Sequence, residues 1–216
     1  MFHPIGVNAG FIVTNKHIVY IDAGMTIPCA KTILGYSMAV AAKNKPKYLI
    51  FTDHHSDHIF GMKVLKDVGA KTLGHVKLNT WLKDYMIKNY RDVIKTFGLS
   101  EHERELIYGD VELYPLDETI SEDTAIRVDD EEINILTTPG HWEACLSVYV
   151  PSSKVLFAGD TIYSGFTPTT RFGNKKLWRK WVDSLEKLRK FDISCIVPGH
   201  GRLCDTEEIS RHIAYL

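Results

Sequence analysis

Short apolar runs separated by polar turns open the chain, which is the pattern of β-strands. Residues Gly10 to Thr14 and His17 to Ile21 are rich in β-branched and aromatic side chains, and Asn15-Lys16 lies between them. Two such runs joined by two polar residues predict an antiparallel hairpin. Two later pairs of runs, 124–128 with 132–136 and 146–150 with 154–158, predict two more hairpins.

Apolar residues that recur every three or four positions predict helices. This spacing covers residues 31–43, 59–68, 77–97 and 176–190, and a terminal helix is expected from Glu207. Between them, residues 71–75 and 193–197 read as strands.

The segment at about 77–107 is the longest helical part and resembles an insertion between strands. Trp81, Tyr85 and Tyr90 lie on its first helix, and Ser100-Glu-His-Glu103 has the spacing of a capping box for a second helix over 101–107. A lid, a homodimer surface and plain core cover are all compatible with such a pair.

Composition narrows the class of protein. The chain has 216 residues, 44% of them hydrophobic, and a formal net charge of -1, so we expect one domain over residues 1–216. The near-neutral charge argues against nucleic acid as a partner. No apolar run approaches the roughly 20 residues that cross a bilayer, and the first residues lack a signal-peptide pattern, so we expect a cytoplasmic protein without a membrane partner.

Metal-binding side chains gather between the apolar run 48–51 and the predicted helix 59–68. Five of the seven residues in Thr52-Asp53-His54-His55-Ser56-Asp57-His58 are imidazoles or carboxylates that can bind a metal, and without a cation the carboxylates would repel one another. Because strand residues alternate sides, Asp53, His55 and Asp57 can point one way together, and the helix start then turns His58 toward the same spot. His54 is expected to point away. The alternative is a solvated loop in which Asp57 caps the following helix.

Three more candidate ligands follow apolar runs and a glycine. They are His141 in Pro139-Gly140-His141, Asp160 in Ala158-Gly159-Asp160, and His200 in Pro198-Gly199-His200. Glycine allows sharp turns and close approach of the backbone, so these repeats can bring ligands from distant parts of the sequence to one sheet edge.

Together these motifs resemble those of the metallo-β-lactamase-fold hydrolase superfamily, with its H-x-H-x-D-H motif followed by Gly-His, Gly-Asp and Gly-His. The resemblance covers nearly the whole chain and includes Asp22-Ala-Gly24. It implies an α+β or α/β protein, a four-layer αββα sandwich with its metals at one sheet edge.

The resemblance also implies a ligand set for two divalent metal ions, which would be zinc, manganese or iron. One ion would bind Asp53, His55 and His141, the other Asp57, His58 and His200, with Asp160 bridging them. The sequence departs from the family pattern at Asp53, where a histidine is usual. Either Asp53 or the neighbouring His54 completes the first site, and alternation favours Asp53.

Such a site implies a hydrolase that uses a metal-bound hydroxide on a small ester, thioester, lactone, amide or phosphodiester. Asp57 is the candidate catalytic residue, because it can orient the hydroxide and move its proton. Arg171, in the loop after Asp160, is a candidate for holding a substrate carboxylate or phosphate. An iron-dependent redox enzyme and a nucleic-acid phosphodiesterase are the alternative functions, and bound iron or salt-sensitive nucleic-acid binding would favour one or the other.

Overall fold

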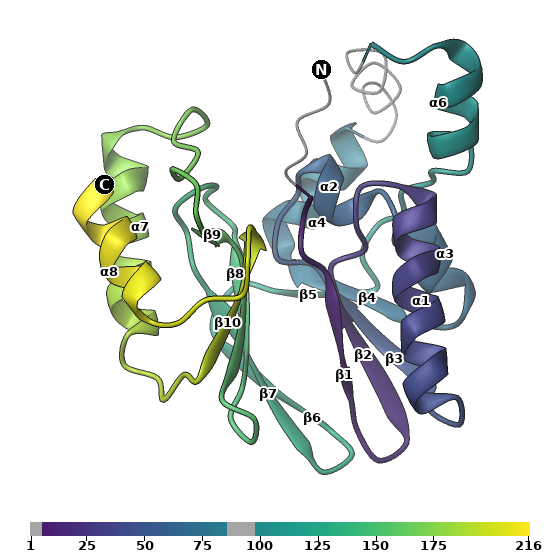
Figure 1. Cartoon of the computed structure of the whole chain (residues 1–216), viewed down its shortest axis with the longest axis horizontal. Helices are drawn as coiled ribbons and strands as arrows, with labels where there is room; N and C mark the ends of the chain where they lie inside the picture. The colour runs from purple at the N-terminus through teal and green to yellow at the C-terminus, as the bar shows by residue number, and fades with distance from the viewer. Residues whose placement is uncertain (1–5, 86–97) are drawn as a thin grey trace. The chain divides into compact units, whose positions relative to one another are not determined.

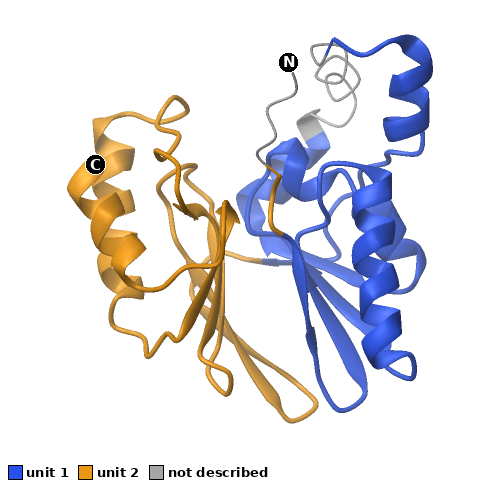
Figure 2. Cartoon of the chain, in the orientation of Figure 1, with its two compact units in different colours: residues 1–4, 9–119 blue, residues 5–8, 120–216 orange. Residues whose placement is uncertain are grey.

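The computed structural model describes residues 6–85 and 98–216, and the chain divides into two compact units (Figure 2). Unit 1 is built mainly from residues 9–119, and unit 2 from residues 120–216 together with residues 5–8. The single domain with a helical insertion at 77–107 stays a prediction. No helix among the described residues is both long and apolar enough to span a membrane.

Unit 1 contains a five-stranded mixed sheet in the order β1-β2-β3-β4-β5 (Figure 1). Its strands are β1 (Gly10–Val13), β2 (His17–Ile21), β3 (Lys45–Ile50), β4 (Lys71–His75) and β5 (Glu118–Ile120). The first two pair antiparallel, which confirms the predicted hairpin, whereas β2, β3 and β4 run parallel. The parallel strands therefore deliver the chain repeatedly to the same sheet edge.

Helices α1 (Ile27–Ala41) and α3 (Met62–Asp67) lie on one face of this sheet (Figure 1). The first begins four residues earlier than predicted, because the Thr26 side chain accepts a hydrogen bond from Cys29 N at 3.1 Å. Pro28 lies in the first turn, where its missing N–H costs nothing. The cap and the proline thus start the helix before the residues whose apolar spacing predicted it.

The single helix predicted over 59–68 is wrong. The structure has a short α2 (Ser56–Ile59) and the separate α3, with Phe60-Gly61 between them. A Cβ at Gly61 would overlap the Ala23 carbonyl oxygen, and Gly61 N donates to Gly24 O at 3.1 Å. The close approach of these two backbones interrupts the helix and packs the residues that follow α2 against Ala23 and Gly24, just after β2.

The predicted helical pair is described in part. Helix α4 (Val76–Tyr85) is present, whereas residues 86–97, including Tyr90, lie outside the described residues. Helix α6 (Glu101–Tyr108) has the predicted capping box, because Glu103 N donates to Ser100 Oγ at 3.2 Å and Ser100 N to Glu103 Oε2 at 2.8 Å. The lid and dimer interpretations of the pair stay predictions.

Unit 2 contains a second five-stranded sheet in the order β10-β9-β8-β7-β6. Its strands are β6 (Thr124–Val128), β7 (Glu131–Thr137), β8 (Leu146–Val150), β9 (Val155–Tyr163) and β10 (Cys195–His200). The two predicted hairpins are confirmed by the antiparallel pairs β6–β7 and β8–β9, and β10 runs parallel to β9. Strand β9 is longer than predicted, so Asp160 lies within it and not at its end.

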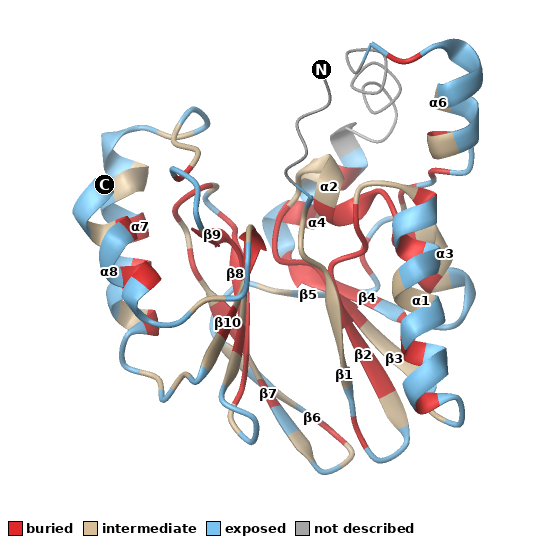
Figure 3. Ribbon diagram, in the orientation of Figure 1, coloured by how far each residue is buried: buried red, intermediate tan, exposed pale blue. Residues whose placement is uncertain are grey.

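Helices α7 (Lys175–Leu188) and α8 (Glu207–Tyr215) cover one face of the second sheet (Figure 1). The faces that they turn toward it are buried, as the red segments of Figure 3 show, and include Trp181, Leu185 and Ile209. Trp181 is fully buried and its Nε1 donates to Thr161 O at 2.9 Å. A side chain this large contributes on the order of 3 kcal/mol through burial, and its hydrogen bond ties α7 to β9 beside Asp160.

His212 of α8 predicts that the protein loses stability in acid. Its Nδ1 donates to Glu208 O at 3.0 Å and its Nε2 accepts from Tyr163 N at 2.9 Å, so the folded ring is neutral. Burial lowers the pKa of His212 below its ordinary 6.5. As pH falls below that ordinary value, the unfolded chain takes up a proton that the folded protein resists, and the free energy of unfolding decreases.

We therefore expect His212→Gln, which keeps an acceptor for Tyr163 N, to show a smaller decrease of unfolding free energy than the unaltered protein when pH is lowered through that range. Urea unfolding at several pH values measures this. The matched control is His102→Gln, because His102 is exposed. Equal pH dependence in all three proteins would contradict the role assigned to His212.

Candidate metal centre

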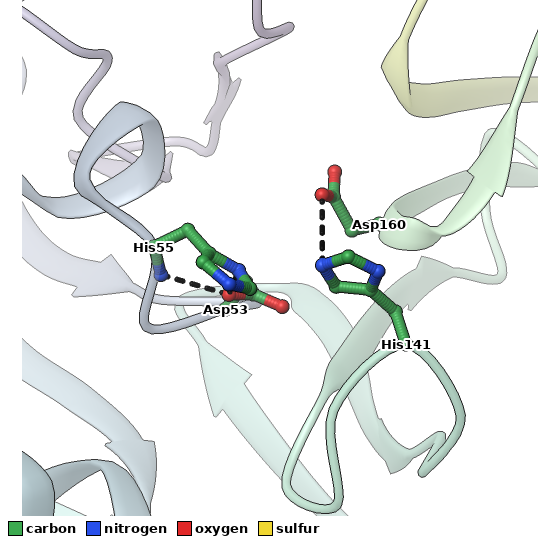
Figure 4. A group of neighbouring side chains, drawn as sticks. All are labelled: Asp53, His55, His141 and Asp160. Carbon is green, nitrogen blue, oxygen red and sulfur yellow. Dashed lines mark hydrogen bonds and ion pairs between the residues drawn. The ribbon is translucent and has the colours of Figure 1, made fainter. Parts of the chain in front are cut away.

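In unit 1, Asp53 and His55 lie in the loop that follows β3 (Figure 4). Asp53 is buried, with 1% of its surface exposed. Its Oδ1 accepts a hydrogen bond from His55 N at 2.8 Å and lies 2.6 Å from His55 Nδ1. The backbone bond fixes the carboxylate, so the two side chains present their polar atoms side by side.

The expectation that His54 points away from Asp53 is wrong. Its Nδ1 lies 3.0 Å from Asp53 Oδ1, and its ring lies 4.1 Å from the His55 ring. The cause is that β3 ends at Ile50, so residues 53–55 form a loop and their side chains do not alternate. Alternation therefore no longer decides between Asp53 and His54 as a ligand.

Asp57 and His58, two of the predicted ligands, lie in the first turn of α2. His58 is fully buried, and its Nδ1 lies 2.9 Å from Asp22 Oδ2. Because a carboxylate only accepts, the proton is on Nδ1 and Nε2 is left to bind a metal. The structure thus selects the tautomer that a metal ligand requires.

The role of Asp22 is missed by the sequence reasoning. Its Oδ1 accepts from Thr52 N at 2.8 Å and its Oδ2 from Thr52 Oγ1 at 2.6 Å, so the carboxylate that holds His58 is itself held. Asp22 has φ of 58°, a left-handed conformation that is uncommon outside glycine. The motif Asp22-Ala-Gly24 after an apolar run was the available signal, but the sequence does not show which side chain Asp22 meets.

In unit 2, two histidines meet the two oxygens of one carboxylate. His141, in the loop after β7, places Nε2 3.5 Å from Asp160 Oδ2, the pair joined by a dashed line in Figure 4. His200, at the end of β10, places Nε2 3.2 Å from Asp160 Oδ1. The three predicted ligands of this half of the chain therefore lie together, with both histidines directed at Asp160.

His141 is oriented as firmly as His58. Its Nδ1 donates to Thr169 O at 3.0 Å, which leaves Nε2 toward Asp160. A Cβ at Gly140 would overlap the Trp181 ring, so the loop can approach α7 only with glycine at that position. Phe172 packs its ring edge-on at 5.5 Å from the His141 ring.

The residues in both units have the chemistry of divalent-metal ligands. Five of them are buried: Asp53, His58, His141, Asp160 and His200. Buried carboxylates and imidazoles are costly unless paired or coordinated, and mixed nitrogen and oxygen donors suit zinc, manganese and iron. The donor types, their burial and the fixed Nδ1 protons of His58 and His141 all fit metal ions.

Curated relatives include hydroxyacylglutathione hydrolases. The one from Bartonella tribocorum is 29% identical over 168 residues, which are 75% of this chain and 52% of the relative. The one from Mesorhizobium japonicum is 28% identical over 119 residues, which are 55% of this chain and 35% of the relative. The chain thus spans about half or less of the length of these relatives.

Solved structures with the same fold include a metallo-β-lactamase from Pontibacter korlensis, at a TM-score of 0.71 and 18% identity over 95% of this chain and 84% of the other. A metallo-β-lactamase family protein from Thermus thermophilus matches at a TM-score of 0.71 and 17% identity over 96% of this chain and 73% of the other. These matches confirm the predicted fold class. Residues 4–200 match the model of the metallo-β-lactamase superfamily, and the chain belongs to that superfamily.

Proposed function

We propose that the protein is a metal-dependent hydrolase of small molecules and that the chain holds two divalent ions. The observation that carries the proposal is the orientation of the imidazoles. Asp22 fixes the Nδ1 proton of His58 and Thr169 O fixes that of His141, which leaves both Nε2 atoms as ligands. A histidine that binds a metal through one ring nitrogen usually donates the N–H of the other to an acceptor of this kind.

The proposed ligands form two groups. Asp53, His55, His141 and Asp160 make the first, and Asp57, His58 and His200 make the second. Asp160 would bridge the two ions, since His141 and His200 approach its different oxygens. Asp53 is preferred to His54 because its carboxylate is buried and fixed by the His55 backbone, although His54 is within reach of the same atom.

When bound, two divalent ions lower the pKa of a water molecule and polarise the bond that it attacks. The side chains of the protein would hold the ions and orient the water. His58, His141, His200 and Asp160 are buried, so solvent has little access to their donor atoms. Asp57, half-buried beside buried His58 in α2, is the proposed group that orients the attacking water and carries its proton away.

The proposed substrate class is thioesters and related small esters. Relatives named hydroxyacylglutathione hydrolases act, by that name, on acyl derivatives of glutathione, and because glutathione is a thiol this supports testing thioesters first. The matched length is about half of those relatives, so lactones, amides, β-lactams and phosphodiesters belong in the same panel.

We expect hydrolysis of at least one member of this panel to disappear when metal is removed with a chelator and to return when manganese, ferrous iron or zinc is restored. Asp160→Ala should abolish the restored activity and lower the bound metal, because a bridging carboxylate is shared by both ions. Asp130→Ala, in an exposed turn, is the control. Undiminished hydrolysis by the chelated protein, or full metal content in Asp160→Ala, would contradict the proposal.

Asp53 bears on the choice of metal. With Asp53, Asp57 and Asp160 the proposed ligand set has three carboxylates, one more negative charge than a set with histidine at position 53. A more negative set of harder oxygen donors favours manganese and iron relative to zinc, and it makes the site a weaker Lewis acid. Activity should accordingly rise toward alkaline pH.

We expect Asp53→His to shift the relative affinity toward zinc and the rising limb of the pH profile toward acid. Metal competition, measured by the elements retained after incubation with equal zinc and manganese, reports the first effect without any assay of hydrolysis. Asp130→His is the matched control, since it adds the same ring at an exposed turn. The same metal preference and pH profile in all three proteins would remove Asp53 from the ligand set.

Arg171 is proposed to bind an anionic group of the substrate. Its guanidinium carbon lies 4.4 Å from the centroid of the Phe172 ring, which in turn packs on His141. Both residues are exposed, and no carboxylate of the described residues forms an ion pair with Arg171. A guanidinium stacked on an exposed ring is preorganised to meet a carboxylate near the metal ligand.

Replacing Arg171 by alanine should raise KM for a carboxylate-bearing thioester roughly 10- to 100-fold, the effect of losing a charged hydrogen bond worth about 1.5–3 kcal/mol. KM for a neutral thioester should be nearly unchanged, and Arg171→Lys should recover part of the loss. The control is Arg179→Ala, an exposed arginine on α7. Equal changes of KM for charged and neutral substrates would argue against the assignment.

A further inference from the structure

Tyr163, at the end of β9, contacts Asp160 in a way that no sequence motif indicates. The residue is buried, and its hydroxyl donates to Asp160 Oδ2 at 2.6 Å. Residues three apart in a regular strand point to opposite faces. Here Pro198 pairs with Gly159 and His200 with Tyr163, so residues 160–162 lie opposite the single residue Gly199. This bulge places Tyr163 and Asp160 on the same side.

The Tyr163 hydroxyl lies near two polar groups, the Asp160 carboxylate and the His141 ring. His141 Nδ1 lies 3.3 Å from the hydroxyl, but that nitrogen already donates its proton to Thr169 O at 3.0 Å. It therefore has no lone pair to offer, and the hydroxyl proton goes to the Asp160 carboxylate. A hydroxyl donating to a carboxylate forms a short, charge-assisted bond that holds Oδ2 in one orientation.

The ring of Tyr163 is fixed as firmly as its hydroxyl. It stacks on the His200 ring at 5.4 Å with an interplanar angle of 14°, and on the His212 ring at 6.4 Å and 16°. Its backbone N–H donates to His212 Nε2 at 2.9 Å. Tyr163 thus contacts Asp160, His141 and His200, which are the three proposed ligands of unit 2, and connects them to α8.

We propose that Tyr163 is a positioning residue that sets the orientation of Asp160 and thereby the affinity of the bridged metal pair. The proposal rests on the metal centre proposed above. The hydroxyl ties down Oδ2, and the stacked ring keeps His200 in place opposite Oδ1. Partners of metal ligands of this kind typically change metal affinity by about 10- to 100-fold when they are removed.

The test compares metal affinity in Tyr163→Phe and in the unaltered protein. The phenylalanine keeps the ring stack and loses only the hydroxyl, so we expect affinity for manganese or zinc, measured by competition with a chromophoric chelator, to fall about 10-fold or more. The matched control is Tyr149→Phe, because Tyr149 is also a buried tyrosine of the same sheet, and its hydroxyl donates to Asp192 O at 2.8 Å. It should lose a similar amount of stability and no metal affinity.

The outcomes separate this inference from the proposed function. Unchanged metal affinity in Asp160→Ala would overturn the metal centre and the role of Tyr163 with it. A loss in Asp160→Ala combined with wild-type affinity in Tyr163→Phe would overturn the role of Tyr163 alone. Wild-type metal affinity with altered KM in Tyr163→Phe would assign the hydroxyl to the substrate and would also overturn the inference. Equal losses of affinity in Tyr163→Phe and Tyr149→Phe would reduce the effect to general destabilisation.

Discussion

Burial of carboxylates and imidazoles is the constraint on which the rest of this structure depends. A buried charged or polar group is costly unless a hydrogen-bond partner or an opposite charge compensates for its lost hydration. Three of the candidate ligands have such a partner. Asp22 holds His58, the Thr169 carbonyl holds His141, and Tyr163 holds Asp160. The supporting residues thus determine which atoms of the ligands remain available to a metal.

The backbone supplies these partners through local irregularities in otherwise regular elements. The chain breaks between α2 and α3 where Gly61 approaches Ala23 and Gly24, just after β2, and Ala23 N donates to His58 O at 2.7 Å next to the contact of His58 with Asp22. In unit 2, the bulge in β9 turns Asp160 and Tyr163 to one side. Regular strands and helices would separate these pairs, so the irregular positions are the ones that build the site.

The sequence predicts the regular elements well because their period is a local property. Runs of β-branched and aromatic residues around polar turns located the hairpins, and the motif Ser100-Glu-His-Glu103 located the capping box of α6. The spacing of the histidine and aspartate motifs indicated the superfamily. Contacts set by tertiary structure could not be predicted. His54 lies beside Asp53 because β3 stops at Ile50. Asp22 contacts His58, which is 36 residues away in the sequence, and Tyr163 reaches Asp160 through a bulge.

The account rests most directly on the proposal that one chain holds two divalent ions. Elemental analysis of protein purified without added metal, and again after incubation with manganese, iron and zinc, measures the number of ions per chain. We expect two after incubation, with His55→Ala and His200→Ala each leaving fewer than two. A chain that takes up no metal under any of these conditions, or that keeps two ions in both variants, would contradict the account.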